Sequence, residues 1–458
     1  MRKPSHVIVL SIPGLRPEDV AAERAPTLQG WARRGALARV RPTFPCVTSP
    51  VQASMLTGVP PARHGVIGNG FYHRDRHEVE FWVGRNEVIE APQIWGVMKR
   101  AGKMPAVRAG RMPALPTGLT AAVWHAQNIK DAAADFVVTP APIHEPDGTT
   151  KLWCYSKPDG LYEQLVADLG HFPLHQYWGP LAGIGSTQWI LAGAQWLIAR
   201  HNPNFHFIYL PHLDYAGQKL GPDSPQAADA VRQLDAELAR FDAFLQQQPY
   251  YDELVIIAAS EYVMTPVSGA VHPNRILRKA GLLRTRTTDD GEVIDFAGSR
   301  AFALVDHQFA HVYAQPDAID EIARIFERTP GISGVFAGSR RAEVGLDHPR
   351  SGEVVLISDE DRWLAYYWWL DDAAAPAFAR TVDIHRKPGY DPVELFFDPR
   401  TKGIPLNADL VKGSHGVPAH ASRHDGALIA SRAGAGVESG RTYRDTDLFD
   451  LMLAALAA

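Results

Sequence analysis

Three mainly apolar runs predict strands that are buried on both faces. They cover residues 7–10, 205–210 and 254–258, and continuous apolar runs of this length are typical of strands in a parallel sheet. Helical patterns follow the first two runs, at about residues 25–36 and 227–247. Because strands and helices alternate, we expect an α/β fold with a mostly parallel central sheet and helices on both faces.

Residues 265–380 have a different pattern, with shorter strand-like runs and one helix. We place the helix at residues 317–328 and the strands at 301–304, 311–314, 350–358 and 363–369. The last of these runs is rich in Trp and Tyr, which are more often core residues than a stacking platform. We therefore expect a single α/β domain over residues 1–458, with residues 265–380 forming an inserted cap on the main sheet.

Composition limits the class of protein and its partners. The chain has 458 residues, 46% of them hydrophobic, and a net charge of −5, which gives no sign of a surface for a nucleic-acid polymer or an anionic membrane. Its two cysteines are too few for a disulfide framework and fit a reducing compartment. The apolar run at residues 7–10 is too short for a signal peptide, and no uncharged run is long enough to span a bilayer. We expect a cytoplasmic protein; its oligomeric state stays open.

The most distinctive stretch begins at residues 44–50, Phe-Pro-Cys-Val-Thr-Ser-Pro, and ends at Asn69. It puts the hydroxyl of Thr48 on a Pro-rich turn ahead of an apolar helical run, and a helix N-terminus favours an anion such as phosphate. Taken alone, Thr48 is either a helix N-cap, the commoner role of a lone Thr, or a nucleophile. Cys46 also has two possible roles: a reactive thiol, or a buried and inert one. The buried, inert role is the commoner for a free Cys.

The whole stretch resembles the nucleophile segment of the alkaline phosphatase superfamily, in its nucleotide pyrophosphatase/phosphodiesterase branch. In that branch Phe-Pro-x-x-Thr supplies the attacking hydroxyl, and a Thr-Gly…His-Gly…Asn run follows, as it does here up to Asn69. The resemblance extends from Val7 to about Gly416 and implies an alkaline-phosphatase-like fold. It also implies that Thr48 is the nucleophile and that Asn69 helps to hold a phosphoryl oxygen. Several strings in the later half look like a bacterial side-branch of the superfamily.

The resembled family holds two divalent ions, usually zinc, and the first ion's ligands are partly matched here. Asp214, which follows the run at 205–210, stands at the position of the first Asp, and His415 at that of a distant His before Gly. The expected His four residues after the Asp is Gln218, a weak neutral ligand. This first ion site is expected to survive in part.

The second ion's ligands are mostly replaced. The nucleophile Thr48 matches, but Pro13 stands at the position of an N-terminal Asp, and Glu261-Tyr262 replace an Asp-His pair after the run at 254–258. Proline has no side-chain donor atom and Tyr is an uncommon ligand. We expect this site to be lost as the family builds it, although Glu261 could still contribute a carboxylate from its strand end.

Other residues could compensate for the missing ligands, and His385 is the best candidate. In Asp383-Ile384-His385 an alternating strand would put Asp383 and His385 on one face, and the following Arg386 and Lys387 could contact phosphate or form a solvated turn. The expected metal ligands are therefore Asp214, Glu261, His385 and His415. They would hold one or two divalent ions, zinc first, with manganese and iron open because Asp and His ligands are mixed.

Two classes of function follow, and a third is weaker. The first is a metal-dependent hydrolase of phosphodiester or pyrophosphate bonds in a small phosphorylated substrate, with Thr48 forming a phospho-enzyme intermediate. The second is a catalytically silent or repurposed member that binds a phosphorylated ligand or a partner protein. The third is a transferase that passes the group to an alcohol. Three or more ligands converging on Asp214 and His415 would favour the enzyme, and two or fewer would favour the binder.

Overall fold

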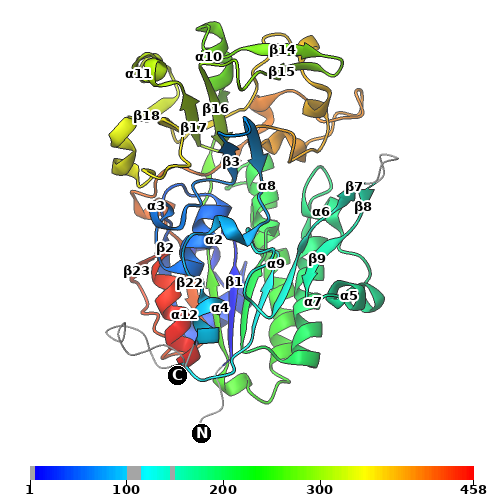
Figure 1. The fold of residues 1–458 in the computed structure, drawn as a ribbon. Helices are drawn as coiled ribbons and strands as arrows, with labels where there is room; N and C mark the ends of the chain where they lie inside the picture. Colours follow the sequence, from blue (N-terminus) through cyan, green and yellow to red (C-terminus); the bar gives the residue numbers. More distant parts are fainter. Residues whose placement is uncertain (1–5, 101–114, 145–149, 458) are drawn as a thin grey trace.

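A computed structural model describes residues 6–100, 115–144 and 150–457 (Figure 1). Its largest feature is a nine-stranded sheet. From one edge to the other its strands are β23 (Thr442–Arg444), β2 (Ala36–Arg41), β22 (Gly426–Ala430), β11 (Val255–Ala259), β1 (Val7–Ser11), β10 (Phe205–Tyr209), β5 (Ala121–Trp124), β6 (Phe136–Pro140) and β9 (Cys154–Lys157). The five strands from β11 to β6 are parallel, and antiparallel pairing occurs only where β22 and β9 join them and between β2 and β22.

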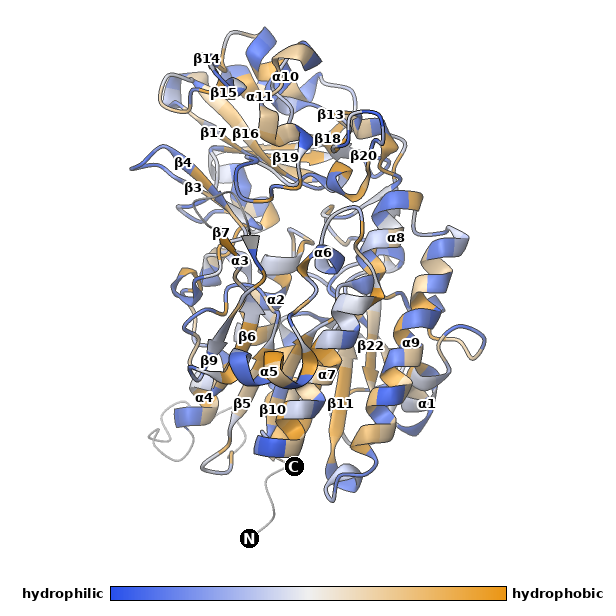
Figure 2. Cartoon of the chain, turned by 90° about the vertical axis from the view of Figure 1, so that its right-hand side faces the viewer, coloured by the Kyte–Doolittle hydropathy of each residue, from blue (hydrophilic) through white to orange (hydrophobic). Residues whose placement is uncertain are grey.

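Helices cover both faces of this sheet. On one face lie α1 (Pro26–Arg34), α5 (Leu161–Leu169), α7 (Ile184–His201) and α9 (Pro225–Leu245), and on the other α2 (Thr48–Thr57), α4 (Ile94–Arg100) and α12 (Asp447–Ala457). Successive residues of β1 pack on opposite faces of the sheet: Ile8 contacts the first group of helices and Val9 the second. In Figure 2 the central strands are hydrophobic along their length, whereas α9 alternates apolar and polar residues. The predicted α/β fold is confirmed.

A second lobe lies beyond the end at which β1, β10 and β11 finish (Figure 1). Its sheet is antiparallel, in the order β16 (Ala301–Asp306), β17 (Phe309–Ala314), β19 (Val354–Ser358) and β18 (Ile332–Ala337), with α10 (Pro273–Lys279) and α11 (Ile319–Glu327) beside it. These elements fall inside the segment expected to form a cap. Its apolar core also takes in residues outside that segment, from Phe81 to Val411, so the lobe is assembled from a longer stretch of chain; the cap boundaries stay a prediction.

The remaining elements are short. The small helices are α3 (Pro61–His64), α6 (Leu174–Tyr177) and α8 (His212–Leu220), and the two-stranded pairs are β3 (Gly70–His73) with β4 (Glu78–Phe81), β7 (Ile143–His144) with β8 (Thr150–Lys151), β12 (Thr265–Pro266) with β21 (Gly413–Ser414), β13 (Gly269–Val271) with β20 (Arg362–Leu364), and β14 (Thr285–Thr288) with β15 (Gly291–Ile294). Within the described ranges, no helix combines the length and apolarity needed to cross a membrane.

One predicted strand is wrong in most of its length. The aromatic run at residues 363–369 is extended only in β20, at Trp363 and Leu364, and the residues after it are irregular. Its aromatic side chains are nevertheless all buried, from Trp363 to Trp369, as expected for core residues. Aromatic residues favour strands mainly because strands offer buried surface, and here a packed loop offers the same burial.

Candidate active site

The polar side chains expected at the strand ends do meet at one end of the main sheet. Ser11 is the last residue of β1, and Asp214 lies in the first turn of α8, directly after β10. Glu261 and Tyr262 follow β11. Because these parallel strands finish at the same edge, their following residues converge there.

Thr48 is the first residue of α2, and its hydroxyl is used for something other than capping. The N-cap residue is Val47, whose side chain makes no capping hydrogen bond. Thr48 Oγ1 lies 3.2 Å from Tyr262 Oη, and that phenol donates to Asp214 Oδ2 at 3.0 Å. Since the phenol has one proton and gives it to Asp214, its oxygen accepts from Thr48. A hydrogen-bonded chain therefore leads from the Thr48 hydroxyl through Tyr262 to the carboxylate of Asp214.

Glu261 is held by two donors that the sequence did not single out. Its Oε1 accepts from Ser11 Oγ and from Gln52 Nε2, both at 2.7 Å. Gln52 lies one helical turn after Thr48, and its own Oε1 accepts from the backbone N–H of Gln127 at 2.7 Å. Burial raises the pKa of Glu261 to about 8, against the lowering effect of these hydrogen bonds. The spacing of four residues from Thr48 on an apolar helix was the one sequence signal for Gln52.

The ring of His415 packs against the ring of Tyr262. Its Nδ1–H donates to the backbone carbonyl of Cys46 at 2.8 Å, and its ring stacks on the Tyr262 ring at 3.5 Å with an interplanar angle of 8°. Burial lowers the pKa of His415 well below its ordinary value, so the ring is neutral. The thiol of Cys46 is itself buried, and burial raises its pKa, in line with the inert reading.

Asn69, the expected phosphoryl ligand, is engaged in binding the cap. Its Oδ1 accepts from Ser49 N at 3.0 Å, while its Nδ2 donates to Asp306 Oδ1 at 3.1 Å and its backbone N–H to Asp306 Oδ2 at 2.8 Å. Asp306 is the last residue of β16 in the second lobe. Asn69 thus links the start of α2 to the cap, and one Nδ2 hydrogen remains for a ligand.

The cap contributes an aromatic stack that ends at the site. The His307 ring lies 3.8 Å from His415 and stacks on Tyr390 at 3.6 Å. Tyr390 in turn donates to Gln218 Oε1 at 2.8 Å. His307 belongs to the turn between β16 and β17, with φ at 61°. Tyr390 stacks on His307 and Tyr262 on His415, and the two histidine rings between them are tilted by 39° to each other.

His385 is not brought to this group. It is exposed, in a turn, with its Nδ1 3.4 Å from the Phe81 carbonyl oxygen, and the expected alternating strand at 383–385 is wrong. The turn is fixed by Asp383, whose backbone N–H donates to Glu394 and whose carboxylate binds Arg386. Within the described residues no contact joins His385 to Asp214, so it stays a candidate ligand without structural support.

Lys387, the other cation of this turn, is a buried structural residue and not a solvated one. Its side chain is 0% exposed and forms ion pairs with Asp391 at 2.8 Å and with Glu394 at 2.6 Å. Arg386 beside it is exposed. A phosphate contact by Lys387 would require this buried network to open.

The side chains present do not fit a two-ion site. In the part of the chain that the structure describes, no three or more His, Cys, Asp or Glu side chains are placed to hold a metal ion. Burial raises the pKa of Asp214 to about 7, and neither Asp214 nor Glu261 has an ion-pair partner among the described residues. Four buried polar atoms in the site nevertheless have no hydrogen-bond partner, namely Asp214 Oδ1, Gln218 Nε2, Glu261 Oε2 and His415 Nε2. Such a set of donors and acceptors suits a small polar ligand or ordered water.

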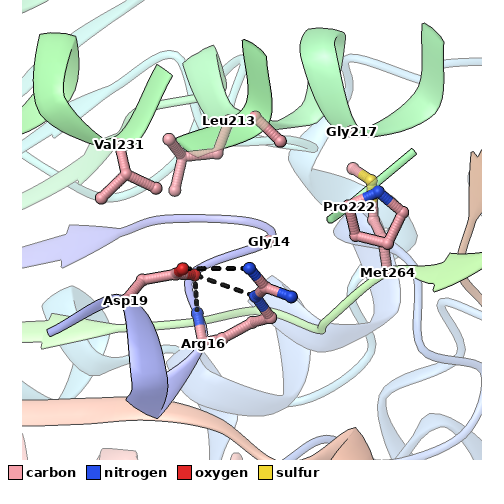
Figure 3. Close-up of a pocket in the computed structure, with 9 residues that line it drawn as sticks. Gly14, Arg16, Asp19, Leu213, Gly217, Pro222, Val231 and Met264 are labelled. Atoms are coloured by element: carbon pink, nitrogen blue, oxygen red, sulfur yellow. Dashed lines mark hydrogen bonds and ion pairs between the residues drawn. The ribbon is translucent and has the colours of Figure 1, made fainter. Parts of the chain in front are cut away.

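A separate small pocket, with a cavity volume of about 20 Å³, lies beside α8 (Figure 3). It is lined by Gly14, Arg16, Asp19, Leu213, Gly217, Pro222, Ala227, Val231 and Met264. Arg16 donates to Asp19 through its Nε and backbone N–H at 3.1 Å, so both charges are already paired. None of the residues of the hydrogen-bonded chain lines this pocket.

The solved structures that share this fold include a phosphonoacetate hydrolase and an ectonucleotide pyrophosphatase/phosphodiesterase. Phosphonoacetate hydrolase from Sinorhizobium meliloti is 18% identical with a TM-score of 0.62, over 99% of this chain and 96% of that chain. Murine ectonucleotide pyrophosphatase/phosphodiesterase 5 is 15% identical with a TM-score of 0.60, over 98% and 95%. At such low identity these likenesses show the fold alone.

Sequence comparison places the chain in a family. An uncharacterised pyrophosphatase/phosphodiesterase of Schizosaccharomyces pombe is 23% identical over 309 residues, which are 67% of this chain and 54% of that protein. The chain spans about half the length of this curated relative. A family model described as type I phosphodiesterase / nucleotide pyrophosphatase matches residues 7–391, most of the chain. The resemblance found in the nucleophile segment is thereby confirmed, and the chain belongs to the type I phosphodiesterase / nucleotide pyrophosphatase family.

Proposed function

We propose that this chain hydrolyses a phosphoester bond of a small phosphorylated substrate, a phosphodiester or a pyrophosphate, with Thr48 as the nucleophile. Family membership supports the class of reaction. The observation that carries the proposal is the hydrogen-bonded chain from Thr48 through Tyr262 to Asp214. It connects a hydroxyl at a helix N-terminus, where an anion is stabilised, to a buried carboxylate that can accept a proton.

In the proposed first step, Thr48 Oγ1 forms a bond to phosphorus while the bond to the leaving oxygen breaks. The hydroxyl proton passes to the Tyr262 oxygen, and Tyr262 gives its own proton to Asp214. The pKa of Asp214, about 7, suits a base that works near neutral pH. The leaving oxygen takes its proton from solvent water. In the second step water attacks phosphorus and the bond to Thr48 Oγ1 breaks; that oxygen recovers its proton from Asp214 through Tyr262, and the proton of the attacking water passes to solvent.

The phosphoryl oxygens would be met by neutral donors. The backbone N–H of Thr48 and the remaining Nδ2 hydrogen of Asn69 are the donors nearest the start of α2, and preorganised donors of this kind stabilise developing charge. The dependence on a divalent ion that the resemblance implies, and zinc in particular, stays a prediction. So does a cytoplasmic location, which cell fractionation would test.

Turnover of a substrate panel by the purified chain tests the proposal. The panel is bis-p-nitrophenyl phosphate, p-nitrophenyl phosphate, a dinucleoside pyrophosphate and phosphonoacetate, each with chelator and with added zinc, manganese or iron. Thr48→Ala is expected to abolish turnover and Thr48→Ser to retain part of it. Thr57→Val is the matched control, because this hydroxyl lies in the same helix and bonds only to the Ala53 carbonyl and its own turn. Unchanged turnover in Thr48→Ala would remove Thr48 as nucleophile.

The second candidate is a member that binds a phosphorylated ligand without cleaving it. The specific observation in its favour is that the described residues offer no group of three metal ligands. Calorimetric titration with AMP and with inorganic phosphate separates the two candidates. Binding by the wild-type chain together with no turnover on the whole panel, in every metal condition, would establish the binder and reject the hydrolase.

A further inference from the structure

We propose that the phenol of Tyr262 takes the place of the second divalent ion, so that this chain holds at most one ion. In the resembled pattern the nucleophile ligates that ion, and a His at the position of Tyr262 ligates it as well. Here Tyr262 Oη lies between the nucleophile and Asp214, which in that pattern ligates the first ion; it is 3.2 Å from Thr48 Oγ1 and 3.0 Å from Asp214 Oδ2. A hydrogen bond therefore orients the nucleophile where a cation would otherwise do so.

The phenol is locked in this position by its surroundings. Tyr262 is 1% exposed, and its ring is stacked on His415 at 3.5 Å. His415 is itself fixed by its hydrogen bond to Cys46 and by the His307 ring at 3.8 Å. Moving the phenol aside to admit an ion would break two hydrogen bonds and a stacked pair. Such a rearrangement would also remove the hydrogen bond that Tyr262 donates to the buried Asp214 carboxyl.

The other replaced positions point the same way. Pro13 has no side-chain donor atom, and Glu261 Oε1 is occupied by Ser11 and Gln52. At Gln218 the amide oxygen accepts from Tyr390, which leaves the unpartnered NH2 in the site. An NH2 group donates hydrogen bonds and cannot ligate a cation. The ligand atoms left without a partner are Asp214 Oδ1, Glu261 Oε2 and His415 Nε2. Among the described residues, no three such side chains are placed to hold one ion, whereas a closed zinc site has four ligands.

Metal stoichiometry is the measurement that tests this inference. The purified full chain is dialysed against excess zinc or manganese, and bound metal is counted by elemental analysis. Wild type is expected to hold one equivalent or less, and the folded double variant Pro13→Asp/Tyr262→His to gain about one equivalent. Tyr313→Phe is the control, since this buried phenol bonds the Arg350 carbonyl in the cap, and it should match wild type. Two firmly bound equivalents in wild type, or no gain in a folded double variant, would overturn the proposal.

A kinetic arm rests on the proposed function, whereas the metal count does not. With an active wild type, Tyr262→Phe is expected to lower kcat by about 10²-fold with no recovery on adding metal, while Tyr313→Phe stays unchanged. Recovery of the Tyr262→Phe rate by added zinc would contradict the replacement of an ion by the phenol. If wild type turns over no substrate, the proposed function fails and the stoichiometry still decides the role of Tyr262.

Discussion

Replacing Lys387 by Met tests whether this buried cation is structural. Its ammonium is 0% exposed and is held 2.8 Å from Asp391 and 2.6 Å from Glu394. Methionine keeps most of the side-chain volume and removes the charge. Two carboxylates would then be buried without a cation, and breaking a buried ion pair in this way costs about 3–5 kcal/mol.

The surviving hydrogen bonds favour the lower half of this range. Glu394 also accepts from the Trp178 indole N–H at 2.5 Å and from the Asp383 backbone N–H at 2.9 Å, and these donors remain in the variant. We therefore expect Lys387→Met to lower the free energy of unfolding by about 3 kcal/mol at pH 7. The deficit should shrink as the pH falls, because the unpaired carboxyls of the folded variant take up protons at a higher pH than those of the unfolded chain.

Urea unfolding, followed by far-ultraviolet circular dichroism at pH 5 and pH 7, measures both effects. The matched control is Arg386→Met, the neighbouring cation, whose ion pair with Asp383 is exposed and should contribute no more than about 1 kcal/mol. If Lys387→Met is no less stable than Arg386→Met, the reasoning on the buried network is refuted. A loss of phosphate binding with unchanged stability would instead make Lys387 a ligand residue.

Three further predictions concern a buried acid, a tight backbone contact and the free thiols. Burial raises the pKa of Asp445 from 3.8 to about 6. Between these pH values the folded state holds more protons than the unfolded chain, so the free energy of unfolding should fall by about 3 kcal/mol as the pH rises. Asp445→Asn should remove this pH dependence, as measured by urea unfolding. Gly413→Ala should lower the melting temperature, because the new Cβ would lie 2.2 Å from the Gly217 carbonyl oxygen, whereas Gly96→Ala, with only an Arg side-chain end nearby, should not. Cys46 and Cys154 are both buried, so a thiol reagent should modify them only in unfolded protein, and rapid labelling of the native chain would contradict their burial.

The main sheet could be predicted because its strands carry their own signal. The apolar run at residues 7–10 becomes β1, since both of its faces are covered by helices. The alternation at Asp383 and His385 involves no apolar run that a sheet would bury. The segment forms a turn, stabilised by the Asp383–Arg386 contact. The spacing of apolar residues predicts which face of a segment is buried. A segment that stays exposed has no buried face, so its spacing does not predict its structure.

In the candidate site, the sequence predicted which segments meet and missed how their side chains pair. Asp214 follows β10 and Glu261 follows β11, the two strands that flank β1, so their proximity follows from the topology. The partners of Tyr262 could not be predicted, because Thr48 is 214 residues away and either a metal ligand or a hydrogen-bonding phenol was compatible with the same string. The contact between Asn69 and Asp306, 237 residues apart, depends in the same way on where the cap lies.

The replaced ligand positions make electrostatic sense as one set. A two-ion site balances several acidic ligands with divalent cations; in this chain the Asp position is Pro13, a His position is Gln218 and another is Tyr262, all uncharged side chains. Glu261 Oε1 accepts from Ser11 and Gln52, and Asp214 Oδ2 accepts from Tyr262, so donors of the chain itself meet the two remaining carboxyl groups. Random loss of single ligands would leave buried charges unpaired, which costs several kcal/mol each. The phenol between Thr48 and Asp214, stacked on His415, avoids that cost, and this is the physical reason to treat the substitutions as a coordinated redesign of the site.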